Sequence, residues 1–562
     1  MNRVTRLLSS LLLAAAPAAA QSAHELPLKH APTKTTAAIT PADLMTRLYI
    51  FADDSMQGRE AGLPGNVKGT NYIAAEIRRL GLVPAGDSGT YFQTIPLKTR
   101  EFDTTSTFTV GGAPLTAFVD YLPNTRVPVT NPAVPIVFGG DFGDSTRTLT
   151  AEQMGGKLVV FRLRGGLGRR IRFPSLPDAV GIALVALDSL PPQFQAFFRR
   201  PQTFVDDIPP GTPAPRPTFL VTSAAAGRLF GKPLDSLNFG TTGATAAITM
   251  RYTTTPVSDP ARNVVGIIPG SDPRLKGEYV AIGGHNDHIG LARPVDHDSI
   301  RIFNEIVRPE GADDARKQPT PEQLAQVNQR LAAFRAAHPG RTRIDSISNG
   351  ADDDGSGSVS ALEIAEYFAA LRQKPKRSLI FVWHVGEEKG LLGSRFFTDH
   401  PTVPRDSIVA QLNMDMVGRG DASDETGRTK DSVALHGSPN YLQLVGSRRL
   451  STELGDLVEQ VNTQGHHNLT FDYALDADGH PANIYCRSDH YEYARYGIPI
   501  VFFTTGLHRD YHQVTDESQY IDYEHMARVD RLVADVALRV ANLDHRVVVD
   551  KPKPDPNGQC RQ

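Results

Sequence analysis

The chain has 562 residues but only two cysteines, Cys486 and Cys560. Two cysteines cannot build a disulfide framework, so the fold has to be held together by an ordinary hydrophobic core. Cys560 lies in a segment rich in proline, lysine and aspartate, which we expect to be mobile. We therefore expect a buried thiol at Cys486 and an incidental thiol at Cys560, although a bridge between the two stays open.

The sequence also lacks an excess of positive charge, with 59 Lys and Arg against 62 Asp and Glu and a formal net charge of -3. Proteins that bind nucleic acids usually carry a basic excess or a dense basic cluster, and this chain has neither. We therefore expect no nucleic-acid partner. With 40% hydrophobic and 22% charged residues the composition is that of a globular protein, and the length exceeds a single hydrophobic core.

No apolar run approaches the roughly 20 residues that a membrane-spanning helix requires. An apolar run at 7–16 follows Arg3 and Arg6 and precedes three alanines. This arrangement is typical of a secretory signal peptide over residues 1–20, cleaved before Gln21. We expect export to the periplasm or the medium, without a stable membrane anchor.

The remaining chain divides by composition. After a flexible leader at 21–39, helix and strand patterns occupy 40–124 and 251–545, which we assign to one discontinuous domain. Between them, 125–250 is rich in proline and in short apolar runs, which predicts a mostly β domain inserted into the first. The end, 546–562, predicts a disordered tail.

The discontinuous domain reads as α/β, with a mixed, mainly parallel sheet flanked by helices. The expected strands are 263–268, 279–283, 378–383, 407–412 and 499–504, and the expected helices include 66–80, 321–337, 359–371 and 523–542. An insertion with its own helix lies between 291 and 348. Ligands of open α/β sheets bind at the carboxyl ends of strands, so side chains that follow these strands are the candidates for a site.

Five residues of metal-ligand type follow these strand ends or begin a helix. They are His285 in GGHNDHIG, Asp353 in GADDDGSG, Glu388 in HVGEEKGLLGS, Asp415 in NMDMVG and His512 in RDYHQVTDE. Each alone has an ordinary explanation, such as a polar loop, a helix start or a core histidine. Together, and in this order, they favour a metal site, because imidazole and carboxylate are the usual zinc ligands.

Neighbouring residues extend the pattern. Asp287 can accept a hydrogen bond from the second ring nitrogen of His285, which a metal-bound histidine needs. The adjacent Glu387 and Glu388 can divide the work, one binding metal while the other accepts a proton from water. A near copy of the third motif, GADD at 311–314, leads into a proline-rich stretch that prevents a helix, so we set it aside as a decoy.

In these motifs and their order, the chain resembles the secreted di-zinc aminopeptidases of bacteria and fungi. Distant relatives of that family include glutamate carboxypeptidase, the transferrin receptor and glutaminyl cyclase. The resemblance covers 42–97 and 259–542 and includes RSDH at 487–490. The region 125–250 resembles, in pattern and position, the protease-associated domain that many members carry.

The resemblance implies a zinc peptidase with two zinc ions per chain and peptides as substrates. The ligands that it implies are His285 and Asp415 for one ion, Glu388 and His512 for the other, and Asp353 as the bridge. Glu387 would be the general base, Asp287 the partner of His285, and Tyr511 a donor to the developing oxyanion. A water or hydroxide held between the ions would attack the peptide bond.

Other positions have less defined roles. Ser488, Asp489 and Asp516 are expected near the site without a specific task. The insertion at 291–348 departs from compact members and is expected to form an extra wall or a lid.

Three further functions stay open beside the aminopeptidase. A glutaminyl-peptide cyclase uses the same fold with one zinc ion, which five ligands argue against. A non-catalytic binding protein is disfavoured by the retention of Glu387. A carboxypeptidase needs cations for the free carboxylate, and Arg419, Arg487 and Arg509 lie in or beside the motifs. The side-chain preference and the oligomeric state do not follow from the sequence.

Overall fold

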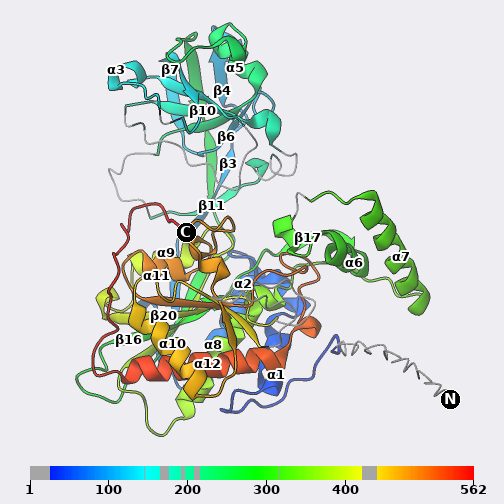
Figure 1. The fold of residues 1–562 in the computed structure, drawn as a ribbon, viewed down its shortest axis with the longest axis vertical. Coiled ribbons are helices and arrows are strands. Elements are labelled where there is room, and N and C mark those ends of the chain that lie inside the picture. The colour runs from blue at the N-terminus through cyan, green and yellow to red at the C-terminus, as the bar shows by residue number, and fades with distance from the viewer. Residues whose placement is uncertain are drawn as a thin grey trace, which may run out of the picture.

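The computed structural model describes residues 26–562 except 145, 165–175, 177, 191–194, 196–197, 208–214, 315–316 and 420–439. The expected signal peptide therefore lies outside the described residues. One body is a mixed sheet covered by helices on both faces, and a second, mostly β body is joined to it through a few strands (Figure 1). Among the described helices, none combines the length and the apolar character that a membrane crossing needs.

The main sheet has the strand order β1-β15-β19-β16-β20-β23-β21-β22, with β2 paired to β15. Its strands are β1 (Val83–Pro84), β2 (Phe92–Ile95), β15 (Ala261–Ile268), β16 (Tyr279–His285), β19 (Ser378–His384), β20 (Ile408–Met414), β21 (Tyr441–Val445), β22 (Thr470–Asp472) and β23 (Ile500–Thr504). The central strands β19, β16, β20 and β23 are parallel, whereas β15 and β21 run antiparallel to this centre. The predicted α/β class is therefore confirmed, with the parallel part at the middle of the sheet.

Side chains of β19 alternate between two hydrophobic layers, because successive residues of a strand point to opposite faces. Leu379, Phe381 and Trp383 face one layer, and Ile380 and Val382 face the other. The first layer contains α1 (Pro41–Phe51), α2 (Pro64–Arg79), α8 (Gly357–Ala370), α10 (Thr452–Gln464) and α12 (Tyr523–Asn542), and the second contains α9 (Leu392–Asp399) and α11 (His490–Ala494). Burial on both faces explains why the central strands read as continuous apolar runs.

The described part of the leader, residues 26–39, packs against the α/β body, so the prediction that it is flexible was wrong there. Thr35 donates a hydrogen bond to Glu366 of α8 at 2.7 Å, and Ile39 is buried in the core. Thr35 and Glu366 are 331 positions apart. Composition could not show this packing, because the partners of the leader lie far away in the sequence.

The tail at 546–562 is also packed, contrary to the predicted disorder. Cys560 forms a disulfide with Cys486, with Cα atoms 5.8 Å apart, which corrects the expectation of two free thiols. Val547 is buried, and the amide of Gln562 donates to the backbone oxygen of Leu475 at 2.8 Å. A covalent bridge and scattered hydrogen bonds hold the tail, and neither leaves an apolar periodicity in the sequence from which the packing could be predicted.

The second body contains a five-stranded and a four-stranded sheet. The first has β6 (Tyr121–Pro123), β12 (Thr218–Val221), β10 (Gly181–Val185), β9 (Leu158–Arg162) and β8 (Ile136–Asp141), and the second has β5 (Ala113–Pro114), β4 (Thr107–Val110), β13 (Ala246–Met250) and β7 (Val129–Val134). Phe108 and Val110 belong to its core, so this body begins near Thr107, earlier than the expected boundary at 125. The strands β3 (Leu97–Phe102), β11 (Gln202–Val205) and β14 (Tyr252–Pro256) form the connection (Figure 1). The likeness to a protease-associated domain stays a prediction.

The insertion at 291–348 projects from the α/β body (Figure 1). It contains β17 (Leu291–Asp296), α6 (His297–Val307), α7 (Pro321–Ala337) and β18 (Ile344–Ile347). Ile302 and Val307 of α6 pack with Val327 of α7 in a small core. Because β17 pairs with β18 in antiparallel fashion, the insertion leaves and rejoins the body at one place.

Candidate metal centre

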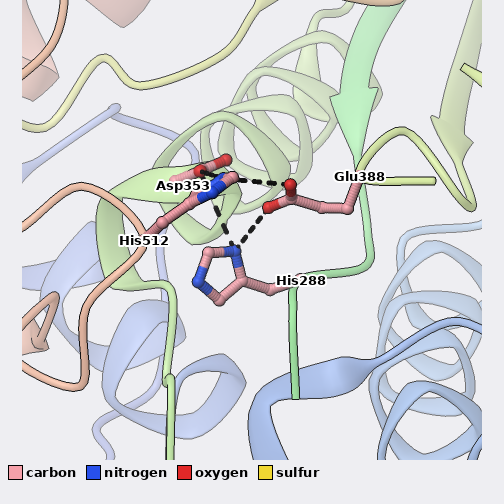
Figure 2. A group of neighbouring side chains, drawn as sticks. All are labelled: His288, Asp353, Glu388 and His512. Atoms are coloured by element: carbon pink, nitrogen blue, oxygen red, sulfur yellow. Dashed lines mark hydrogen bonds and ion pairs between the residues drawn. The ribbon is translucent and has the colours of Figure 1, made fainter. Parts of the chain in front are cut away.

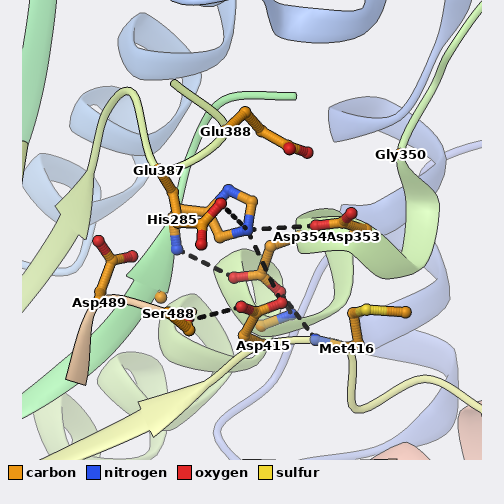
Figure 3. Close-up of polar contacts among 12 residues, drawn as sticks. His285, Gly350, Asp353, Asp354, Glu387, Glu388, Asp415, Met416, Ser488 and Asp489 are labelled. Atoms are coloured by element: carbon orange, nitrogen blue, oxygen red, sulfur yellow. Dashed lines mark hydrogen bonds and ion pairs between the residues drawn. The ribbon is translucent and has the colours of Figure 1, made fainter. Parts of the chain in front are cut away.

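The five predicted ligands meet at one edge of the main sheet. His285 ends β16, Glu388 follows β19, and Asp415 follows β20. Asp353 lies in the turn before α8, and His512 lies in the loop after β23. Four of these segments follow parallel strands whose carboxyl ends lie at one edge of the sheet, and the turn before α8 brings Asp353 to the same place (Figure 2 and Figure 3).

Asp353 lies between two histidines. Its Oδ1 is 3.2 Å from His285 Nε2, and its Oδ2 is 2.9 Å from His512 Nε2. On the outer sides, Asp415 Oδ1 is 3.7 Å from His285 Nε2, and Glu388 Oε2 is 2.9 Å from His512 Nε2. The two oxygens of one carboxylate thus face two separate pairs of donor atoms.

These spacings suit metal binding. Donor atoms around a tetrahedral zinc ion with bonds of about 2.0–2.2 Å lie roughly 3.3–3.6 Å from one another. His285 Nε2 and Asp353 Oδ2 are buried, and neither makes a well-aligned hydrogen bond within the described residues. Clustered carboxylates also repel one another unless a cation is present. The set of donors therefore fits a zinc site.

A further histidine belongs to this cluster and was not singled out from the sequence. His288 is fully buried, its Nδ1 lies 2.8 Å from Glu388 Oε1, and its ring packs edge-on against His512 (Figure 2). The donor atoms of His288, Asp353, Glu388 and His512 all lie within 4.8 Å of one another. The sequence signal for His288 was its place as the second histidine of GGHNDHIG. That signal was not sufficient, because the direction of a side chain beyond the end of a strand depends on tertiary contacts.

A second group of close donor atoms contains His285, Asp354 and Asp415. Both Asp354 oxygens already accept backbone N–H groups. Oδ2 accepts from His285 at 3.0 Å (Figure 3), and Oδ1 accepts from Gly357 at 2.8 Å. Asp354 therefore fixes the backbone around the ligands. Asp353, whose Oδ1 faces the same His285, is the better candidate for a ligand.

Asp287 supports the site in a way that differs from the prediction. His285 Nδ1 lies 3.0 Å from the backbone oxygen of Asp287, whereas the nearer carboxylate oxygen of Asp287 is 3.7 Å away. That carboxylate oxygen accepts the backbone N–H groups of Gly386 at 2.8 Å and Glu387 at 3.2 Å. Asp287 thus connects the segment of the first histidine to the turn that carries the two glutamates.

Glu387 and Glu388 have different proton affinities. Burial raises the pKa of Glu387 well above its ordinary value; His285 opposes this effect, and Glu388 adds to it. Burial and Asp353 would also raise the pKa of Glu388, but His512 and His288 hold it at about 2. Glu388 therefore stays ionised, as a ligand must, and Glu387 is suited to take up a proton. Glu387 Oε2 is 4.0 Å from His285 Nε2.

Of the three other residues that were expected near the site, Asp516 and Ser488 hold parts of it in place. Asp516 accepts the backbone N–H of Asp353 at 3.1 Å, which fixes the turn of that residue. The Ser488 hydroxyl donates to Asp415 Oδ2 at 2.7 Å. Burial raises the pKa of the Asp489 carboxyl to about 7.

A pocket adjoins the cluster. Its lining includes Asp353, Glu387, Asp415, Ser488 and Tyr511, together with the apolar side chains of Met416, Leu475, Ile484, Phe502 and Leu507. A lining that combines several apolar side chains with a few polar groups is typical of a ligand site.

The three arginines beside the motifs are engaged with carboxylates. Arg419 pairs with Asp510 at 2.8 Å, Arg487 with Asp313 at 2.9 Å, and Arg509 with Glu305 at 3.2 Å. A substrate carboxylate would have to compete with these partners.

Residues 335–537 match the model of peptidase family M28. The match includes Asp353, Glu387, Glu388, Asp415 and His512, and it confirms the resemblance to a peptidase family that the motifs predicted.

The proteins to which this chain is similar include aminopeptidases. Leucine aminopeptidase 1 of Aspergillus niger is 27% identical over 201 residues, which are 34% of this chain and 46% of that protein. The chain thus spans about half the length of this relative. Two solved structures are similar to this chain at 15% identity. An aminopeptidase from Aneurinibacillus sp. strain AM-1 is covered over 97% of its length and 92% of this chain, with a TM-score of 0.48. A zinc aminopeptidase from Bacillus subtilis is covered over 95% of its length and 89% of this chain, with a TM-score of 0.43.

Proposed function

We propose that the protein is a zinc-dependent exopeptidase of aminopeptidase type that holds two zinc ions. His285 and Asp415 would hold one ion, Glu388 and His512 the other, and Asp353 would be shared. The observation that carries this proposal is the position of Asp353, whose Oδ1 lies 3.2 Å from His285 and whose Oδ2 lies 2.9 Å from His512.

The chemistry follows from the residues around the pocket. Bound zinc acidifies a coordinated water to a pKa of about 7 and polarises the scissile carbonyl. Glu387 accepts a proton from the attacking water and passes it to the leaving amine, and its raised pKa suits this transfer. Tyr511 lines the same pocket and can donate its hydroxyl proton to the carbonyl oxygen as negative charge develops.

The charges around the pocket favour an aminopeptidase over a carboxypeptidase. Carboxylates of Glu387 and Asp415 line it and attract a substrate ammonium group. Arg487, which lines it as well, is paired with Asp313. The apolar part of the lining suits an apolar first residue such as leucine, in keeping with the similarity to leucine aminopeptidases.

Cleavage of leucyl p-nitroanilide, its N-acetylated form and peptides with varied C-termini tests this proposal, with zinc counted per chain. We expect cleavage of the free leucyl substrate, none of the acetylated one, loss of activity with a chelator and recovery with zinc. Release of C-terminal residues would contradict the aminopeptidase. One zinc ion per chain together with cyclisation of N-terminal glutamine would favour a glutaminyl cyclase instead.

Glu387→Gln tests the general base. The variant keeps the size of the side chain but cannot accept a proton, so we expect turnover to fall by about 10²–10⁴-fold while both zinc ions stay bound. The matched variant Glu388→Gln should instead lose zinc, because Glu388 contacts His512 and His288 directly. Full turnover in Glu387→Gln would refute the assignment of the base.

A further inference from the structure

The insertion at 291–348 contains GADD at 311–314, the near copy of the bridging-ligand motif that sequence analysis set aside. In the structure this short segment reaches the candidate site. Asp313 Oδ2 lies 2.9 Å from Arg487 Nη1, and Arg487 Nη2 lies 3.1 Å from the hydroxyl oxygen of Tyr511. Asp313, Arg487 and Tyr511 therefore form a chain of contacts from the insertion to the pocket.

The direction of the hydrogen bonds in this chain is fixed by chemistry. An arginine side chain only donates, so the Tyr511 oxygen must act as the acceptor for Arg487. A tyrosine hydroxyl carries one proton, which remains free to be donated to a different acceptor. Tyr511 lines the pocket, where that acceptor would be a substrate oxygen. The contact with Arg487 thus orients the hydroxyl for donation into the pocket.

Asp313 determines where the guanidinium of Arg487 lies. The side chain of Arg487 is 26% exposed, so burial alone does not hold it. The two oxygens of Asp313 face two nitrogens of the guanidinium, at 2.9 Å and 3.5 Å. A carboxylate that meets both nitrogens fixes the plane of the group as well as its position. Without it, Arg487 would be free to turn away from Tyr511.

Backbone contacts hold the insertion against the loop of Tyr511. The N–H of Ala312 donates to the backbone oxygen of Tyr511 at 3.0 Å, and the Asn304 amide of α6 donates to the backbone oxygen of Arg509 at 3.0 Å. Gly311 has a φ of +54°, and a Cβ there would lie 2.6 Å from the backbone oxygen of Tyr511. The close approach of the insertion to the Tyr511 backbone therefore requires glycine at position 311. The next two residues then contact Tyr511, Ala312 directly and Asp313 through Arg487.

We propose that Asp313 is a positioning residue of the peptidase site, which acts through Arg487 to aim the hydroxyl of Tyr511 at the substrate carbonyl oxygen. The insertion then takes part in stabilising the oxyanion, in addition to forming a wall. This inference rests on the proposed function.

The test compares Asp313→Asn, Asp313→Glu and Tyr511→Phe, with Asp314→Asn as the matched control. Asp314 lies in the same motif, but it contacts the backbone of Glu310 and the side chain of Lys317. For leucyl p-nitroanilide we expect Tyr511→Phe to lose about 10²-fold in kcat, as the loss of one oxyanion donor does. Asp313→Asn should lose roughly tenfold in kcat, with KM within about twofold of the wild type. Asp313→Glu should recover part of the lost kcat, and Asp314→Asn should have the kcat and KM of the wild type.

A double-mutant cycle separates positioning from general damage to the fold. If Asp313 acts through Tyr511, adding Asp313→Asn to Tyr511→Phe should lower kcat by less than about twofold more. The same tenfold loss in both backgrounds, or wild-type kcat in Asp313→Asn, would overturn the inference.

Crystal structures of the wild type and Asp313→Asn provide a readout that does not depend on turnover. Loss of the contact between Arg487 and Tyr511 in the variant supports the inference, and its retention overturns it. Failure of the wild type to cleave any aminoacyl substrate would instead refute the proposed function, so the two failures are distinguishable.

Discussion

His288→Ala should weaken the binding of one zinc ion and leave the other in place. The substitution removes the 2.8 Å contact to Glu388 Oε1, while Oε2 of the same carboxylate keeps its 2.9 Å contact with His512. Loss of a group that orients a metal ligand typically lowers metal affinity by about 10–100-fold, or roughly 1.4–2.7 kcal/mol. Within the described residues no hydrogen bond or ion pair joins His288 to His285 or Asp415, so the ion that these two would hold should be retained.

Competition with a chromogenic zinc chelator measures both affinities on the folded protein. We expect two dissociation steps in the variant, one close to the wild-type value and one weaker by at least about tenfold. His490→Ala is the matched control, since His490 is also fully buried but contacts the backbone oxygen of Tyr485. Two wild-type affinities in a folded His288→Ala protein would show that His288 lies beside the site without supporting it.

Two predictions concern stability. Cys560→Ser opens a cross-link that spans 74 positions, so denaturant titration should show a loss of about 4 kcal/mol with turnover unchanged; an unaltered free energy of unfolding would contradict it. Arg47→Met removes the cation 2.8 Å from the buried Glu363, which should cost about 3–5 kcal/mol at pH 8, where Glu363 is mostly ionised in the wild type. Burial raises the pKa of Glu363 to about 7 from 4.5, so its contribution to stability is present below pH 4.5 and lost as the pH rises through about 7. The damage in Arg47→Met should therefore be smaller at pH 5 than at pH 8, and the same loss at both would count against this reasoning.

The sequence predicted the centre of the fold because the central strands have a simple pattern. All seven residues of β19 are buried, and the strand ends at the polar run that begins with His384. Parallel strands end at the same edge of a sheet, so the meeting of ligands from 285, 388 and 415 followed from the strand assignment alone. Long helices with an apolar stripe, such as Tyr523–Asn542, were predicted for the same local reason.

Features that depend on contacts between distant segments were not predicted. The packing of the leader depends on partners such as Glu366, and the tail is held by a disulfide whose cysteines are 74 positions apart. The role of Asp287 was predicted as a side-chain contact, but its carboxylate is taken by the N–H groups of another loop. Residue type and spacing predict that a side chain is near a site, whereas its partner depends on the loops that meet there.

The position of the insertion shows why a long interruption between two ligands is compatible with one metal centre. It separates His285 from Asp353 in the sequence, yet their donor atoms lie 3.2 Å apart. Its two ends are paired, Leu291 with Ile347, so the chain returns to the point from which it left and the geometry of the ligands does not depend on the length between. The distal part of the insertion is then free to contact other loops, and it packs against the one that carries Tyr511. An insertion that follows the segment of His285 can in this way act on Tyr511, which lies beside His512.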